Sequence, residues 1–511
     1  MTNNLFSKAI LLALMLISIN AIALPPKAQF DLLKIQLVEQ VKTEDYERTL
    51  LTIDKMRNLG FPLPSSMDYF EGKALFETDN RVEAYHKFDK YVRQNGRKGK
   101  YYKKSLAYIA KAESVYKEKI RIENEIAERE AREEQERIEN AYIQGNKYFH
   151  GNGVTQDYKQ AVVWWRKAAD QGHVAAQFNL GSMYDAGNGV AKNDTQAVAW
   201  YRKAANQGDA QAQYTLGFMY DKGKGVAEDN KQALAWYRKA ADQGYIDAHS
   251  ALGIMYANGE GVAEDDKQAV VWFRKAAKQV DEFAQFNLGL MYDNGEGVAE
   301  DNKQAVAWYR KAADQGYVLA QSALGVMYAN GEGVAKDDKQ AVAWYRKAAN
   351  QGYAAAQYNL GFMYDHGEGV AEDNKQAVAW YRKAANQAYA FAQSALGAMY
   401  ANGEGVAEDN KQAVAWYRKA ANQGDALAQY NLGFMYANGK GVPEDDKQAV
   451  AWFRKAANQG DVDAQYNMGV MYDNGEGVAE DNKQAVAWYR KAANQGNESA
   501  QSILSDMGET W

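Results

Sequence analysis

Ten tryptophans at an unbroken spacing of 36 residues constrain the fold of this chain more than any other feature. They are Trp164, Trp200, Trp236, Trp272, Trp308, Trp344, Trp380, Trp416, Trp452 and Trp488. A strict period of this length is typical of a solenoid, in which each repeat packs against its neighbours and the array offers an extended binding surface. Since the core of a solenoid lies between units, the 511 residues need not share one compact core.

The first half of each repeat predicts a short amphipathic helix. In the unit that begins at Ala284, the residues Ala284, Leu288 and Met291 fall on one face of a helix that ends near Asn294. Gly289 interrupts this helix, and a glycine inside a helix costs about 1 kcal/mol relative to alanine. Its return in every unit indicates that a second helix approaches the backbone closely there. Gly295 follows as a left-handed helix end.

The second half of each repeat predicts another helix, which starts at a capping box. Asp301 is placed to accept from the backbone amide of Gln304, and the glutamine side chain is placed to reach back. The apolar arc that contains Trp308 and Tyr309 is too broad for a helix with one neighbour. We therefore expect this helix to pack between its own partner and the next unit, with Gly316 ending it.

These residues resemble the Sel1-like repeat family, whose 36-residue units are related to tetratricopeptide (TPR) repeats. The resemblance rests on the patterns A-x-x-x-L-G-x-x-Y-x-x-G-x-G-V and D-x-x-x-A-x-x-W-Y-x-K-A-A-x-x-G, and it covers ten units over about residues 137–496. It implies antiparallel helix pairs stacked into a right-handed superhelix. The expected fold is an all-α, right-handed α/α superhelical solenoid of helix-turn-helix repeats, preceded by a TPR-like helical region.

The N-terminus has the pattern of a secretory signal peptide over residues 1–23. A short basic start precedes the apolar run Ala9–Ile19, and Ala21-Ile-Ala23 supplies a cleavage site before Pro25. The run is too short and too polar at its end to span a bilayer comfortably, although an uncleaved anchor is the alternative. We expect a Sec-type signal in a bacterial protein, a periplasmic or secreted location, and no integral membrane segment after cleavage.

Three further segments complete the expected organisation. Residues 24–111 predict a helical region with one loosely TPR-like helix pair between Asp68 and Phe88. Residues 112–136 predict a charged connecting helix, with a short dimerising coiled coil as the alternative. Residues 497–511 predict a capping helix, because a terminal repeat must tolerate a solvent-facing side.

Composition excludes several classes of function. The chain has no cysteine, so disulfides, thiolate catalysis and Cys-ligated zinc are impossible. Its net charge is -6 and no basic cluster stands apart from compensating acids, which argues against a nucleic-acid partner. The five histidines are scattered, and no nucleophile has a histidine and carboxylate arranged around it. We expect neither catalysis nor a cofactor or metal.

Candidate binding residues lie at the variable positions of the first helices. These positions carry aromatic groups in tandem, with asparagines beside them, where a plainly solvated helix would be polar. The resemblance implies that such positions line the concave surface. The predicted ligand-binding set is Tyr214, Phe218, Phe286, Tyr358, Phe362, Tyr430, Phe434, Tyr466, Asn359 and Asn431. The alternative is that these side chains only fill gaps between successive first helices.

The function predicted from these observations is an exported, non-catalytic adaptor that binds one or more proteins on its concave face. The alternative is a binder of peptidoglycan or another cell-wall glycan, or a modulator of a peptidoglycan-active enzyme. In that case the aromatic groups would stack on sugars.

Overall fold

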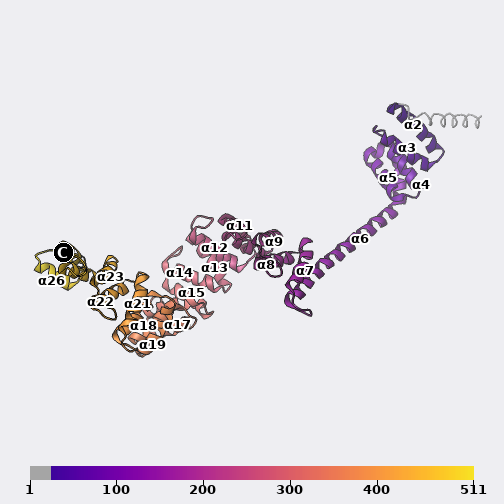
Figure 1. The fold of residues 1–511 in the computed structure, drawn as a ribbon. Helices are drawn as coiled ribbons and strands as arrows, with labels where there is room; N and C mark the ends of the chain where they lie inside the picture. Colours follow the sequence, from indigo (N-terminus) through magenta and orange to yellow (C-terminus); the bar gives the residue numbers. More distant parts are fainter. Residues whose placement is uncertain (1–24) are drawn as a thin grey trace, which may run out of the picture. The chain divides into compact units, whose positions relative to one another are not determined.

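The computed structural model describes residues 25–511, so the predicted signal peptide over residues 1–23 lies outside the described residues. The chain divides into two compact units, one up to Gln144 and one over Gly145–Trp511. Within residues 25–511 the structure contains 25 α-helices, one 3-10 helix and no strand (Figure 1). None of these helices has both the length and the apolar character that a bilayer span requires.

The first unit consists of four helices and most of a fifth. The elements are α2 (Pro26–Lys42), α3 (Tyr46–Asn58), α4 (Ser66–Glu77), α5 (Arg81–Asn95), η2 (Gly96–Lys98) and α6 (Tyr102–His150). The helix α6 continues past Gln144, so its last turns supply the first helix of the first repeat. The predicted connecting segment is therefore the middle of one 49-residue helix.

The second unit continues as alternating first and second helices of the repeats, each 12 or 13 residues long until the shorter α26. They are α7 (Tyr158–Asp170), α8 (Val174–Ala186), α9 (Asp194–Asn206), α10 (Ala210–Asp221), α11 (Asn230–Asp242), α12 (Ile246–Asn258), α13 (Asp266–Lys278), α14 (Glu282–Asn294), α15 (Asn302–Asp314), α16 (Val318–Asn330), α17 (Asp338–Asn350), α18 (Ala354–His366), α19 (Asn374–Asn386), α20 (Ala390–Asn402), α21 (Asn410–Asn422), α22 (Ala426–Ala437), α23 (Asp446–Asn458), α24 (Val462–Asn474), α25 (Asn482–Asn494) and α26 (Glu498–Asp506). From α7 to α26, successive helices pack against each other in the order of the chain.

The TPR-like pair in the first unit is α4 with α5. A Cβ atom at Gly72 would lie 3.0 Å from the ring of Phe88, so the missing side chain lets the two helices approach. Ala74, Ala84 and Phe88 are fully buried, as the loose TPR pattern predicts. The carboxylate of the buried Glu71 forms ion pairs with the guanidinium group of Arg57 and the ammonium group of Lys87, each at 2.9 Å.

The end of each first helix and the start of each second helix follow the predicted signals, except that the Asp301 amide donates to the carbonyl oxygen of Tyr292 and not to the Gln304 side chain. Gly295 ends α14 in the left-handed region with φ of +73°. The carboxylate of Asp301 then accepts from the backbone amides of Lys303 and Gln304, which caps α15. An aspartate or asparagine side chain caps all of the remaining second helices from α7 to α25 in the same way.

The recurring glycine inside each first helix is explained by an aromatic ring. A Cβ atom at Gly289 would lie 2.6 Å from Cδ1 and 2.7 Å from Cε1 of Tyr309. Tyr309 is fully buried, so its ring has no room to move away. The close approach predicted from the sequence is thus confirmed, and the group that approaches is a side chain of the second helix.

A second glycine in each turn is required by the preceding unit. Gly297 has φ of +68°, and a Cβ atom there would lie only 2.3 Å from the carbonyl oxygen of Asp266. Because Asp266 begins the second helix of the unit before, any side chain at Gly297 would push two repeats apart. The glycine therefore fixes the spacing between successive units.

The tryptophans belong to the packing between units, as the breadth of the apolar arc predicts. Trp308 packs against the core cluster formed by α13 and α14, which includes Phe273 and Leu288. The ammonium group of Lys311 lies 3.7 Å from the centre of the Trp308 ring and covers its outer side. This cation–π contact recurs beside all ten tryptophans of the ladder.

Arginine on each second helix forms a further link to the next unit. Arg274 of α13 donates to the hydroxyl of Tyr292 on α14 at 2.8 Å, and Arg346 repeats the contact with Tyr364 at 2.9 Å. After the last second helix there is no such tyrosine. Arg490 instead donates to the backbone oxygen of Thr510 at 2.6 Å and pairs with Glu509.

A buried glutamine joins three successive helices, a feature that the sequence analysis missed. Gln285 of α14 donates to the carbonyl oxygen of Ala277 at 3.1 Å, and Ala277 lies in the last turn of the preceding α13. Gln315, which ends α15, donates to the side-chain oxygen of Gln285 at 2.9 Å. The glutamine thus satisfies a carbonyl that a helix end leaves without an intrahelical partner. In α12 the residue His249 replaces it and bonds to Ala241.

Candidate functional site

The candidate site is the surface formed by the fifth and ninth residues of successive first helices, called here the first-helix face. The fifth position carries five of the predicted residues, and all five are half-buried: Tyr214, Phe286, Tyr358, Tyr430 and Tyr466. Their ring centres lie 5.5 to 5.8 Å from the core ring of the second helix in the same unit. They are less exposed than the sequence pattern predicts, because each first helix contacts second helices on two sides.

The ninth position is more accessible. Phe218 is 41% exposed and Phe434 is 39% exposed, whereas Phe362 is half-buried and stacks on His366 with ring centres 4.0 Å apart. Asn359 and Asn431 are half-buried beside the aromatic groups. The first-helix face therefore offers the edges of half-buried rings together with exposed phenylalanine side chains.

The tyrosines of this face are neutral hydrogen-bonding groups. Burial raises the pKa of the Tyr214, Tyr358 and Tyr430 phenols above the ordinary value of 10.0, since a buried phenolate would lose its hydration. Near neutral pH each hydroxyl can donate and accept one hydrogen bond without carrying charge. This chemistry suits contact with a peptide or another polar surface and supplies no nucleophile.

One cavity of about 440 Å³ opens on this face across three successive first helices. Its walls come from Tyr214 and Phe218 on α10, from Ser250 on α12 and from Phe283 on α14. Two of the predicted residues, Tyr214 and Phe218, are thus brought together at the wall of one open cavity. The four carboxylates that also line it, those of Asp221, Asp247, Glu260 and Asp281, were not predicted, because they come from the ends and turns of different helices.

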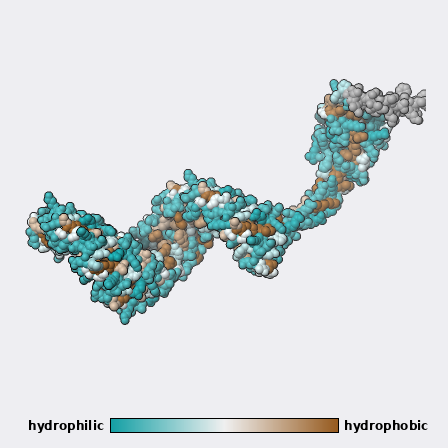
Figure 2. Space-filling model, viewed as in Figure 1, coloured by the Kyte–Doolittle hydropathy of each residue, from teal (hydrophilic) through white to brown (hydrophobic). Residues whose placement is uncertain are grey.

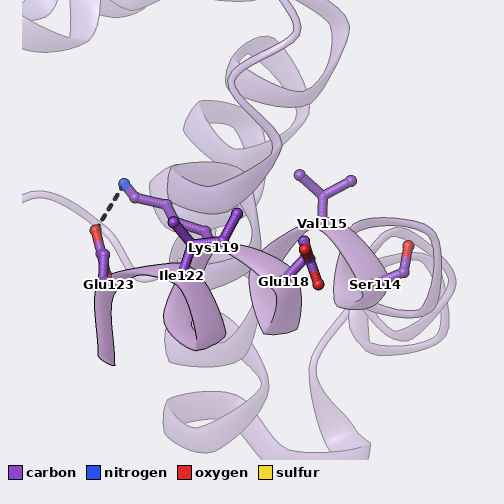
Figure 3. Close-up of a pocket in the computed structure, with 6 residues that line it drawn as sticks. All are labelled: Ser114, Val115, Glu118, Lys119, Ile122 and Glu123. Atoms are coloured by element: carbon purple, nitrogen blue, oxygen red, sulfur yellow. Dashed lines mark ion pairs between the residues drawn. The ribbon is translucent and has the colours of Figure 1, made fainter. Parts of the chain in front are cut away.

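A shallow, open pocket of about 580 Å³ lies along α6, and all of its lining residues come from that helix (Figure 3). Val115 and Ile122, seven residues apart, are exposed, and Lys119 pairs with Glu123 at 3.7 Å. Figure 2 shows hydrophobic residues along this helix. The stripe is short, and the predicted coiled-coil alternative for this segment stays a prediction.

The described part of the chain holds no group of three or more histidine and carboxylate side chains placed to bind a metal. Its histidines also lie apart: His249 stacks on Trp272 with ring centres 5.7 Å apart, while His366 is exposed beside Phe362. Neither histidine contacts a hydroxyl that it could activate among the hydrogen bonds of the structure. Neither of these two histidines is therefore paired with a hydroxyl group in the way that a general base is paired with a nucleophile.

The Sel1 repeat model matches ten consecutive segments of the chain between residues 145 and 497. A protective antigen of uropathogenic Escherichia coli with an SLR (Sel1-like repeat) fold is similar, with 35% identity, a TM-score of 0.66 and coverage of 90% of each chain. A Sel1 repeat protein from Oxalobacter formigenes is 40% identical with a TM-score of 0.50, covering 60% of this chain and 89% of that one. No curated protein matches the sequence.

Proposed function

The chain belongs to the Sel1 repeat family, and we propose on that premise that it is an exported adaptor that holds a partner protein on its first-helix face. Sel1 repeat solenoids mediate protein–protein interaction, and their scaffolds are generally non-catalytic. The face is therefore assigned to protein binding rather than to chemistry.

The observation that carries this proposal is the exposure of apolar rings at the ninth position. Phe218 and Phe434 are large, apolar and about two-fifths exposed. They are not needed for the core, because the buried positions of their helices are occupied by residues that recur in each repeat. Aromatic side chains on a rigid scaffold are frequent anchors at protein interfaces. A solenoid also holds them at a fixed pitch without a conformational cost on binding.

Export is supported by the sequence pattern of residues 1–23 and by one similar protein, the protective antigen of uropathogenic Escherichia coli. A protective antigen must be accessible to the host, which favours a location outside the cytoplasm. Glycan binding, the alternative from the sequence, stays a prediction, and no observation favours it over protein binding.

Site-specific photo-crosslinking tests the proposed face. A photoreactive residue near Phe218 should crosslink a defined protein in envelope extract, and the double variant Phe218→Ser/Phe434→Ser should lose that product. The matched control is Val163→Ser/Val271→Ser, since Val163 and Val271 are 47% and 43% exposed on second helices. The control should keep the product. Equal crosslinking by both variants would contradict the assignment of this face.

Export is tested separately with a fusion of residues 1–30 to a phosphatase that is active only outside the cytoplasm. The fusion should be active, and replacement of Leu12 by arginine should abolish activity, because a charge in the apolar run prevents its insertion. An inactive fusion that accumulates in the cytoplasm would refute export and leave the binding face untouched.

A further inference from the structure

The fifth position of the first helices alternates between large and small residues along the middle of the array. In one unit this position carries an aromatic residue, and in the next unit it carries a serine that is followed by an alanine. The serines are Ser250, Ser322 and Ser394, which lie 72 residues apart and are all buried. A small side chain between two aromatic neighbours leaves space, so the first-helix face is expected to be hollowed in every second unit.

The cavity of about 440 Å³ described above is the first of these hollows. Ser250 forms its floor, where the neighbouring units carry Tyr214 and Phe286. The hydroxyl of Ser250 donates to the carboxylate of Asp281, which begins α14. Farther along the array, the hydroxyl of Ser394 is buried and has no hydrogen-bond partner within residues 25–511.

The charge in the first hollow is predominantly negative. Of its five charged lining residues, only Lys222 is basic, and it pairs with Asp221 at 3.0 Å. Asp281 receives hydrogen bonds from the Ser250 hydroxyl and the Phe283 amide, which are neutral donors and leave its charge uncompensated. Burial and then the negative charge of Asp281 raise the pKa of Asp247, as expected where two carboxylates lie near each other without a cation.

We propose that this hollow receives the lysine or arginine side chain of an extended segment of the partner protein. The aromatic rings of Tyr214 and Phe218 contact the aliphatic stem, and the carboxylates of Asp247 and Asp281 bind the cationic head. This inference rests on the proposed function, because it names the chemistry of the partner that the first-helix face holds. The walls come from three successive first helices, which suits a chain that crosses the repeats.

The chemistry favours a basic side chain over an apolar one. An apolar group in the hollow would bury Asp247 and Asp281 further without a counter-charge, which is costly. A cation fills the same space and supplies the counter-charge that the two carboxylates lack. A basic segment also complements the net charge of the whole chain, -6.

The test begins with peptides selected from a random displayed library on the full purified chain. Peptides that bind are expected to carry lysine or arginine beside apolar residues. The best peptide is then titrated by fluorescence anisotropy against Asp247→Asn/Asp281→Asn. Asparagine retains the shape of both side chains and the helix cap at residue 281, so the variant should fold. Affinity should fall at least tenfold.

Two matched controls isolate the hollow. The variant Glu300→Gln/Glu372→Gln removes the same charge from two exposed turn residues and should leave affinity within twofold. The variant Ser250→Tyr fills the hollow with the residue that neighbouring units carry at this position, and it should abolish binding, whereas Ser322→Tyr should not.

The outcomes separate this inference from the proposed function. Peptides without basic residues, or tight binding retained by Asp247→Asn/Asp281→Asn, overturn the cation-binding hollow. If such peptides still depend on Phe218 and Phe434, the adaptor proposal stands without it. Failure to select any peptide, together with unchanged crosslinking in Phe218→Ser/Phe434→Ser, overturns both.

Discussion

Alanine at Gly289 is expected to destabilise its repeat, although alanine is the better helix former. In an open helix this change would stabilise by about 1 kcal/mol. Here the new Cβ atom would lie 2.6 Å from Cδ1 of Tyr309, well inside the 3.4 Å at which ordinary contact begins. Overpacking in a core costs about 1 to 3 kcal/mol, and Tyr309 is too buried to yield. The expected net effect is a loss of about 1 kcal/mol.

The assay is amide hydrogen exchange of peptides from α14 and α15, because it reports the stability of this repeat within the intact array. Exchange should be several-fold faster in Gly289→Ala, and peptides from the distant α24 should be unchanged. The same substitution in a Tyr309→Leu background should have the opposite sign. With the ring removed, the closest remaining atom is the carbonyl oxygen of Ala305, 3.3 Å from the new Cβ atom, and the helix preference of alanine should slow exchange relative to Tyr309→Leu alone.

The sign reversal is the decisive result. Slower exchange in Gly289→Ala with Tyr309 present would show that the ring does not require the glycine. Equal destabilisation in both backgrounds would also refute the reasoning, since the cost would then come from the helix and not from the contact.

Three further changes follow from the packing. Leucine at Gln357 deletes the buried donor to Ala349 and should cost about 1 to 3 kcal/mol, seen as faster exchange in α18 and α19; unchanged exchange contradicts it. Glycine at Ala388, whose φ is +62°, should stabilise the fold by about 0.5 to 1 kcal/mol, and a urea midpoint that does not rise would contradict this. Burial and then the charge of Lys275 lower the pKa of His249. Below about pH 6.5 the unfolded chain therefore binds a proton that the folded chain does not, so the free energy of unfolding decreases as the pH is lowered. His249→Gln should flatten that fall between about pH 6.5 and 5, and an unchanged slope of the urea midpoint would refute it.

The helix pairs and their ends could be predicted because each local signal occurs in every unit. Asp301 starts a helix through its capping side chain, and Gly295 ends one through its left-handed backbone, so both signals are local. Gly289 was informative for a similar reason, since an unfavourable residue that returns at a fixed period indicates a contact. The identity of that contact, the Tyr309 ring, needed the packed structure.

The glutamine bridges could not be predicted from the same pattern. A glutamine in a short helix looks like a solvent-facing residue, yet Gln285 is buried. Its partners, Ala277 and Gln315, lie 8 and 30 residues away on two other helices. Such a bond depends on how units stack, and the spacing within one repeat does not contain that information.

The candidate site was predicted in position but not in shape. The variable positions do lie on one face, and Tyr214 and Phe218 do line a cavity. The sequence did not indicate that the tyrosines are half-buried, because that depends on the width left free by two neighbouring helices. Asp247 and Asp281 belong to different repeats, and only the stacked array brings them to one hollow.

The contacts made by Arg490 bear on self-assembly. Arg274 and its equivalents bind a tyrosine of the following unit, so every junction is a head-to-tail contact between unlike surfaces. Such contacts have no inherent end, and between separate molecules they would build filaments. At the last of these second helices, Glu509 and the backbone of Thr510 bind Arg490 within the same chain, so its guanidinium group is satisfied without the tyrosine of a further unit.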